Sequence, residues 1–205
     1  MSSAAELDER LRELARSEPA LMRALRAARE LGLKEWCIAA GAVRNPVWDR
    51  LFNCTAAPGD VDLVYFDAAN TDPQCDRDLQ DWLQAQVPEL EWEVVNQAGV
   101  HRWYEAAYGC ALAPHRSLEG ALASWPETAT AVCLRLEADD QLTVLAPLGL
   151  QDLFDGVLRH NPARSSAAQF QQRVLSKRFL QRWPRLSLAA PTAAAGCWPA
   201  SPPAP

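Results

Sequence analysis

The segment from Trp36 to Phe66 constrains the fold most, because it contains two apolar runs, one followed by a glycine and one that begins with a pair of aspartates. The first run ends at Gly41, and the second carries Asp60 and Asp62, which are separated by one residue. Strand residues alternate between the two faces of a sheet, so both carboxylates project to the same side. Neighbouring carboxylates repel each other unless they face water or share a cation. The pattern therefore predicts a strand whose acidic face is either solvated or built to hold a metal ion.

The remaining chain alternates between helical and strand-like patterns, which predicts an α+β (α/β) fold with helices packed on one mixed β-sheet. Residues 5–32 are expected to form two short helices separated at Pro19, where proline suits a first helical turn. Further helices are expected at 46–52, 74–86, 117–123 and 166–183, and strands at 35–39, 60–66, 91–96, 130–136 and 142–145. The aromatic passage 97–116 is expected to be an irregular loop that covers the site.

The chain is long enough for one well-packed domain, since 49% of its 205 residues are hydrophobic. We predict a single domain over residues 1–186, with the helices of 5–32 at its start and a basic helix, 166–183, at its end. Residues 187–205 are rich in proline and alanine, and we expect this tail to be disordered.

The charge of the chain is unevenly distributed. The net charge of -6 argues against a general nucleic-acid-binding surface. From Gly156 onward, however, the chain has no Asp or Glu, while it carries Arg159, Arg164, Arg173, Lys177, Arg178, Arg182 and Arg185. Two interpretations follow: the final helix packs a basic face against an acidic body, or it contacts phosphate or RNA.

Cellular location is predicted from cysteine usage and the N-terminus. The six cysteines show no CxxC pair and no metal-ligand spacing, which favours a reducing compartment. The charged N-terminal stretch does not read as a signal peptide. No apolar run approaches the roughly 18 residues of a membrane helix. We therefore expect a cytoplasmic protein with no membrane partner; the sequence does not predict its oligomeric state.

The candidate chemistry begins with Gly41 and the two aspartates. A glycine that follows a strand and opens a helix lets backbone amides approach an anion. Asp60 and Asp62 can hold one or two Mg²⁺ ions, which prefer oxygen ligands and complete their shell with substrate phosphates. A third carboxylate, Glu93 or with less support Glu91, would bridge a metal or act as a base. The alternative is that the aspartates only start a strand and face solvent.

Two further groups of polar residues flank this segment. Arg44 offers a fork that suits phosphate and Asn45 can contact a base or sugar; alternatively, Asn45 caps a helix and Arg44 pairs with an aspartate. After the third strand, Asn96 and Gln97 are candidates for substrate contact, whereas His101 is either catalytic or structural. In the same passage, the aromatic residues best placed to stack on a base are Trp103 and Tyr104.

The segment resembles the nucleotidyltransferase fold of the DNA polymerase β type, in which a strand and a glycine turn precede an Asp-x-Asp strand. More narrowly, the chain resembles a bacterial family of nucleotidyltransferase-like proteins without an assigned substrate, over roughly residues 5–183. The resemblance rests on five blocks in order: AAGAVRNPVWD (39–49), DVDLVYFD (60–67), WEVVNQAGVH (92–101), SWPETATAVCLRL (124–136) and APLGLQDLFDGVLRHNP (146–162).

This resemblance implies a minimal nucleotidyltransferase fold and a Mg²⁺-dependent (or Mn²⁺-dependent) transfer of an NMP group from an NTP to a hydroxyl on an unidentified small molecule, RNA or protein. Asp60, Asp62 and Glu93 would be the metal ligands and catalytic residues, with Gly41 and Ala42 at the phosphates. Ala42 departs from the Gly or Ser of the broader superfamily. An inactive module on the same fold, binding a nucleotide or a partner, is the alternative.

Overall fold

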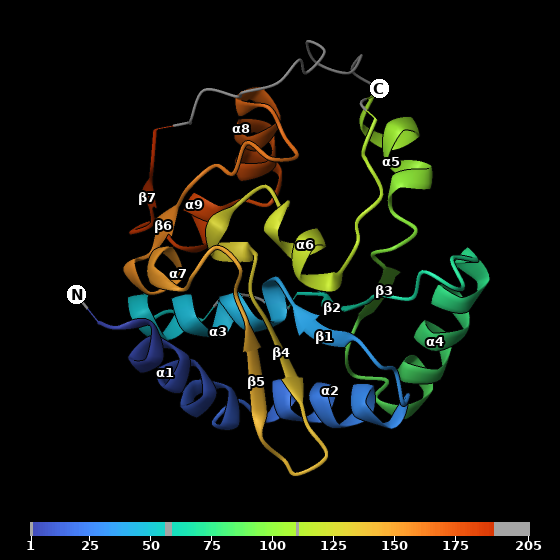
Figure 1. Ribbon diagram of the computed structural model, residues 1–205. Helices are drawn as coiled ribbons and strands as arrows, with labels where there is room; N and C mark the ends of the chain where they lie inside the picture. Colours follow the sequence, from blue (N-terminus) through green and yellow to red (C-terminus); the bar gives the residue numbers. More distant parts are fainter. Residues whose placement is uncertain (1, 56–58, 110, 191–205) are drawn as a thin grey trace.

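The computed structural model describes residues 2–55, 59–109 and 111–190, and Figure 1 shows their arrangement. The helices are α1 (Ala4–Arg16), α2 (Pro19–Glu30), α3 (Gly41–Phe52), α4 (Pro73–Gln86), α5 (His101–Tyr108), α6 (Leu118–Ala123), the 3-10 helix η1 (Thr128–Thr130), α7 (Gln151–Asp155), α8 (Ala167–Ser176) and α9 (Phe179–Arg182). The strands are β1 (Trp36–Ala39), β2 (Val61–Tyr65), β3 (Trp92–Asn96), β4 (Cys133–Leu136), β5 (Leu142–Leu145), β6 (Val157–Leu158) and β7 (Ser187–Leu188).

The main sheet has five strands in the order β3-β2-β1-β4-β5. Strands β2 and β3 run parallel because α4 crosses over between them, whereas β1 pairs antiparallel with both β2 and β4. The sheet is therefore mixed, and the predicted α+β architecture with helices packed on one mixed sheet is confirmed. The register places Asp62 directly beside Glu93 on the neighbouring strand.

The two faces of the sheet have different coverings, as strand alternation requires. One face carries Ile38, Leu63 and Val94 into the large core under α1, α2 and α4. The other face presents Cys37 and Val64 to a smaller cluster formed with α6 (Figure 1). Because Asp62 and Glu93 alternate with the core-facing residues, they project on the α6 side. That side is therefore the one on which a site can form.

Helix α3 is held from the C-terminal side by aromatic packing. Trp48 and Trp183 are both fully buried, with ring centroids 5.0 Å apart, and the Trp48 indole also contacts Phe179 at 6.0 Å. The Trp48 Nε1 donates a hydrogen bond to the carbonyl of Leu153 at 3.0 Å. The C-terminal helices thus fix the position of α3, whose first turn lies next to the acidic strand.

Two predicted elements differ from the structure after β3. The passage 97–116 is not loop throughout, because His101–Tyr108 forms α5 and Gly109 ends it with a φ of 72°. Tyr104 is buried against Val100. This packing stabilises a short helix in a stretch for which the sequence had predicted a loop. The helix expected over 166–183 is broken at Arg178, whose φ of 55° separates α8 from α9 and directs Trp183 toward α3.

The predicted boundaries also fail at α3 and at the tail. Helix α3 begins at Gly41, not at Pro46, because the N–H of Arg44 bonds to the carbonyl of Ala40 at 2.8 Å and closes the first turn. Pro46 therefore lies inside the helix. The tail predicted to be disordered from Ser187 starts with β7, which pairs in parallel with β6. Residues 191–205 lie outside the described residues.

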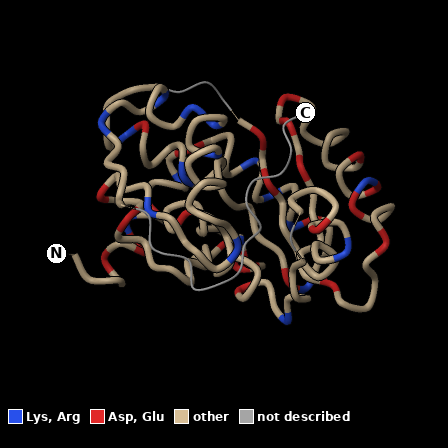
Figure 2. Tube along the Cα trace, turned by 90° about the horizontal axis from the view of Figure 1, so that it is seen from above, with Lys and Arg blue, Asp and Glu red and all other residues tan. Residues whose placement is uncertain are grey.

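The basic C-terminal segment lies on the side of the molecule away from α4 (Figure 2). One part of it packs against an acid, as the first interpretation expects: the Arg173 Nε bonds to the buried carboxylate of Glu127 at 2.5 Å. Another part faces the acidic site, as described below. No helix within the described ranges has both the length and the apolar character needed to cross a membrane.

Candidate active site

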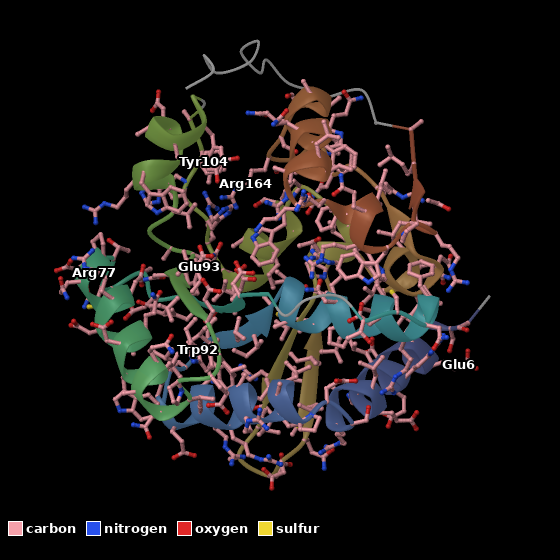
Figure 3. All side chains as sticks on the ribbon, turned by 180° about the vertical axis from the view of Figure 1, so that it is seen from behind. Glu6, Arg77, Trp92, Glu93, Tyr104 and Arg164 are labelled. Atoms are coloured by element: carbon pink, nitrogen blue, oxygen red, sulfur yellow. The ribbon has the colours of Figure 1, made fainter. Side chains whose placement is uncertain are left out.

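Three carboxylates converge on the α6 side of the sheet. Asp60 directly precedes β2, Asp62 lies within it, and Glu93 lies beside Asp62 on β3. One ligand oxygen from each residue lies within 4.8 Å of those of the other two. Figure 3 shows Glu93 on the side of β3 on which the labelled Tyr104 and Arg164 also lie. The convergence expected of shared metal ligands is therefore present, although β2 starts at Val61 and not at Asp60.

The acidic cluster carries more negative charge than the neighbouring basic residues compensate. Burial, then the charge of Asp60, then the charge of Glu93 raise the pKa of Asp62 from 3.8 to about 7. Lys177 and Arg44 act in the opposite direction but do not compensate for this effect. A carboxyl with such a pKa exchanges its proton readily for a metal ion near neutral pH. The local charge is therefore suited to a divalent cation.

The turn before α3 supplies donors beside the acids. Ala40 has φ 51° and ψ -122°, and Gly41 and Ala42 follow as the first two residues of α3. Backbone N–H groups at this position have no intrahelical partner, and the positive end of the helix dipole lies there. The arrangement is the strand–turn–helix geometry predicted around Gly41, and its N–H groups are placed so that an anion could approach them.

The backbone conformation of Ala40 predicts a stabilising substitution. Its φ and ψ lie where glycine is favoured and a Cβ is strained. We expect Ala40→Gly to raise the free energy of unfolding by about 1 kcal/mol, since relief of strain exceeds the added chain entropy. Urea denaturation measures this effect. The control is Ala42→Gly, because Ala42 has a helical conformation and its replacement should lower the free energy of unfolding by roughly 0.5–1 kcal/mol. Equal losses of stability in the two variants would show that the backbone of Ala40 is not strained.

The structure places the side chain of Arg44, a residue of α3, in the interior. Its side chain is buried, with the guanidinium 5.0 Å from the Trp48 ring and 4.7 Å from the Phe179 ring. It donates to Thr130 Oγ1 at 2.7 Å and to Asn45 Oδ1 at 2.9 Å. Burial lowers its pKa to about 10. Two of its nitrogens therefore serve the packing around α3, whereas its Nε is buried without a partner among the described residues, and a phosphate contact by Arg44 stays a prediction.

Asn45 remains beside the site because Arg44 orients it. Its Oδ1 accepts from Arg44, and a methyl group placed on Gly41 would lie 3.4 Å from its Nδ2. A methyl group on Gly59 would lie 3.6 Å from the same atom. The amide N–H₂ of Asn45 thus lies between the turn before α3 and the loop that leads into Asp60.

The residues predicted after the third strand separate into two groups. Asn96 is engaged within the fold, since its Oδ1 accepts from the N–H of Asp67 and its Nδ2 donates to the carbonyls of Asp67 and Asn70. It anchors the loop after β2, and a nucleotide contact is not supported. Gln97 and His101 differ from Asn96, since each keeps a buried polar atom, Oε1 and Nδ1 respectively, without a partner among the described residues.

The two predicted stacking residues also differ. Tyr104 is buried and its ring lies 4.3 Å from the guanidinium of Arg164, so it is not available to stack on a base. Trp103 is 44% exposed on α5 and stays available.

Sequence reasoning did not single out Lys177 as a site residue, although it belongs to the acid-free C-terminal stretch. Lys177 follows α8, and its positive charge lowers the pKa of Asp62 against the larger effect of burial. More than a hundred residues separate the two along the chain, so no spacing rule connects them. The only available signal was the basic composition of this stretch.

The geometry defines a class of protein, because the glycine turn, the paired aspartates and the mixed sheet recur in nucleotidyltransferases. An NMR structure described as a CCA-adding enzyme head domain matches with a TM-score of 0.76 at 28% identity, over 88% of this chain and 95% of that chain. A CCA-adding enzyme in complex with CTP matches with a TM-score of 0.53 at 16% identity, over 92% of this chain and 44% of that one. The Thermotoga maritima CCA-adding enzyme with tRNA matches at 0.50 and 14% identity, over 84% and 40%.

The chain belongs to the family described as Nucleotidyltransferase, whose profile matches residues 26–188. The predicted resemblance to the DNA polymerase β type of fold is thereby confirmed. The chain spans less than half the length of the CCA-adding enzymes solved with CTP and with tRNA, and at their identities these two show the fold alone. A comparison with curated proteins finds no match.

Proposed function

We propose that this protein is a divalent-metal-dependent nucleotidyltransferase that moves an NMP group from an NTP to an acceptor hydroxyl and releases pyrophosphate. The observation that carries the proposal is the convergence of Asp60, Asp62 and Glu93, with ligand oxygens within 4.8 Å of one another. Membership of the family and the likeness to a CCA-adding head domain support the same class of reaction.

The three carboxylates fit Mg²⁺ or Mn²⁺, because they offer only oxygen ligands and carry excess negative charge. The raised pKa of Asp62, caused first by burial and then by the neighbouring acids, is the structural sign of that excess. When bound, the metal would supply charge stabilisation to the attacking and leaving oxygens.

The remaining roles belong to the chain itself. The N–H groups of Gly41 and Ala42 donate to phosphate oxygens of the NTP, and the helix dipole of α3 favours their charge. The amide of Asn45 donates beside them. Glu93, the most exposed of the three acids, accepts the proton of the acceptor hydroxyl as the new P–O bond forms and pyrophosphate leaves.

A thermal-shift screen tests the nucleotide-binding step. An NTP that binds only the folded protein raises its melting temperature, and the increase should require Mg²⁺ or Mn²⁺. Pyrophosphate release in the presence of candidate acceptors then tests turnover. Metal-dependent binding without turnover for any acceptor tested would favour the inactive binding module, and absence of metal-dependent binding would contradict the site.

The pKa of Asp62 predicts a pH dependence of stability. Folding raises this pKa from 3.8 to about 7, so the folded state binds the proton more tightly, and the metal-free protein loses stability as the pH rises through this window. Divalent metal needs the deprotonated carboxylate, so its stabilising effect should grow in the same window.

Melting temperatures with and without Mg²⁺ at about pH 5.5 and about pH 8 measure this effect. The increase caused by metal should be small at the lower pH and clear at the higher one. In Asp62→Asn the metal-free profile should be flatter. A metal effect of equal size at both values would show that Asp62 does not bind the ion.

A further inference from the structure

Helix α5 carries a stack of aromatic side chains. The rings of Tyr104 and Tyr108, one helical turn apart, have their centroids 4.6 Å from each other. The Arg164 guanidinium lies over the Tyr104 ring at 4.3 Å, and the Trp103 ring adjoins Tyr104 at 6.3 Å. Since two groups this close to one ring centre cannot share a face of it, Tyr104 lies between the guanidinium and Tyr108. The stack therefore ends on the ring of Tyr108.

The inner and outer members of this stack differ in exposure. Tyr104 is the residue through which α5 is buried, whereas Tyr108 is 47% exposed and Trp103 is 44% exposed. In the described part of the chain, Trp82 on α4 is the one other aromatic side chain that is exposed. Large aromatic side chains are rarely left in water side by side. Two of them on one eight-residue helix indicate a surface that a ligand covers.

The stack begins next to the acidic cluster. Val95 lies two residues after Glu93, so both side chains project from the same face of β3. Val95 packs against Val100 and Tyr104, which fixes the start of α5 on that face. Figure 3 shows Glu93, Tyr104 and Arg164 on this one side of the strand. The exposed rings thus continue from the side of the site on which Glu93 lies.

The strand register shows which substrate approaches from that side. Asp62 pairs with Ala39 on β1 and with Glu93 on β3, so it lies between the two. The turn proposed to hold the triphosphate directly follows Ala39. In transfer of a phosphoryl group, the attacking and leaving oxygens lie roughly in line through the phosphorus. Pyrophosphate held at the turn therefore places the acceptor hydroxyl on the Glu93 side, next to the aromatic stack.

The ligand that continues such a stack is a nucleobase. Every base has a flat face that stacks on aromatic rings, and this contact does not depend on which base is present. We infer that Tyr108 and Trp103 form a stacking platform for a base of the acceptor, so that the acceptor is a nucleotide or a single-stranded nucleic acid. The assignment to the acceptor rests on the proposed transfer reaction.

A fluorescently labelled single strand of about six nucleotides, titrated with Mg²⁺ but without NTP, tests the platform by fluorescence anisotropy. The same strand with abasic sugars keeps the phosphate charges but has no bases, and it should bind more weakly. Tyr108→Ala should weaken binding of the normal strand roughly tenfold and leave that of the abasic strand unchanged. Trp103→Ala is a second variant with the same expected direction.

Two control variants separate stacking from other effects. Tyr108→Phe keeps the ring and should keep the affinity of the wild type. Trp82→Ala removes an exposed aromatic ring from α4, which covers the other face of the sheet, and should not change the affinity. Equal affinity for the normal strand in Tyr108→Ala, Trp103→Ala and the wild type would overturn the platform, as would equal binding of the normal and abasic strands.

The same variants distinguish this inference from the proposed function. The thermal shift caused by NTP with Mg²⁺ should persist in Tyr108→Ala; its loss would overturn the assignment to the acceptor, because the platform would then hold the base of the NTP. Asp62→Asn should retain binding of the normal strand, since Asp62 lies outside the platform. Base-dependent binding without pyrophosphate release would support the platform and contradict the transfer reaction.

Discussion

Replacing Asp62 with asparagine is expected to lower the rate of nucleotidyl transfer about a thousandfold or more, equivalent to roughly 4 kcal/mol of transition-state stabilisation. Asparagine has nearly the shape of aspartate but cannot carry the negative charge that a divalent metal requires. Asp62 is the residue in the middle of the cluster, beside Glu93 in the register and one residue from Asp60. Its loss therefore removes the ligand that the other two acids surround.

The fold should survive this substitution. The burial of Asp62 and the charges of its acidic neighbours already disfavour the carboxylate, so the metal-free variant should unfold at the same urea concentration as the wild type or a higher one. The matched control is Glu91→Gln, because Glu91 is exposed just before β3 and lies outside the cluster. Turnover by Asp62→Asn at the rate of this control would contradict the proposed mechanism.

The largest loss of stability is expected from Glu127→Gln. Glu127 is fully buried and accepts a hydrogen bond from the Arg173 Nε at 2.5 Å. Burial lowers the pKa of Arg44, and the charge of Glu127 partly opposes that effect. Removal of the carboxylate leaves Arg173 without its ion-pair partner and takes away the larger of the two acidic charges that act on the buried Arg44. Breaking a buried pair in this way costs about 3–5 kcal/mol, and the lower end applies because Arg173 can turn toward solvent.

Urea denaturation of Glu127→Gln measures this cost. Glu105→Gln, which removes an exposed acid on α5, should change the free energy of unfolding by less than about 0.5 kcal/mol. Since α3 is held by Arg44 and the C-terminal aromatic residues, we also expect weaker NTP-induced stabilisation in Glu127→Gln. A loss no greater than that of Glu105→Gln would show that the buried pair contributes nothing to stability.

Much of the fold could be predicted from local patterns. Alternation along β3 placed Glu93 and Trp92 on opposite sides, and the structure has Trp92 in the core and Glu93 exposed. The proline at the start of α2 follows from a backbone preference that acts within a few residues. The turn before α3 does not, because its glycine-like φ lies at Ala40 and not at Gly41. Helix α5 was missed because its stability comes from burial of Tyr104 against residues outside the helix.

The sequence by itself determined the acidic face. A spacing of two residues puts Asp60 and Asp62 on one side of any strand, whatever the strand packs against. The tertiary structure alone decided which cations act on them. Arg44, close in sequence, packs against the rings of Trp48 and Phe179, and its charge still lowers the pKa of Asp62. Lys177, at the end of α8, has the larger effect of the two. The physical reason is range: strand alternation is a property of neighbouring residues, but burial and charge proximity depend on how distant segments pack.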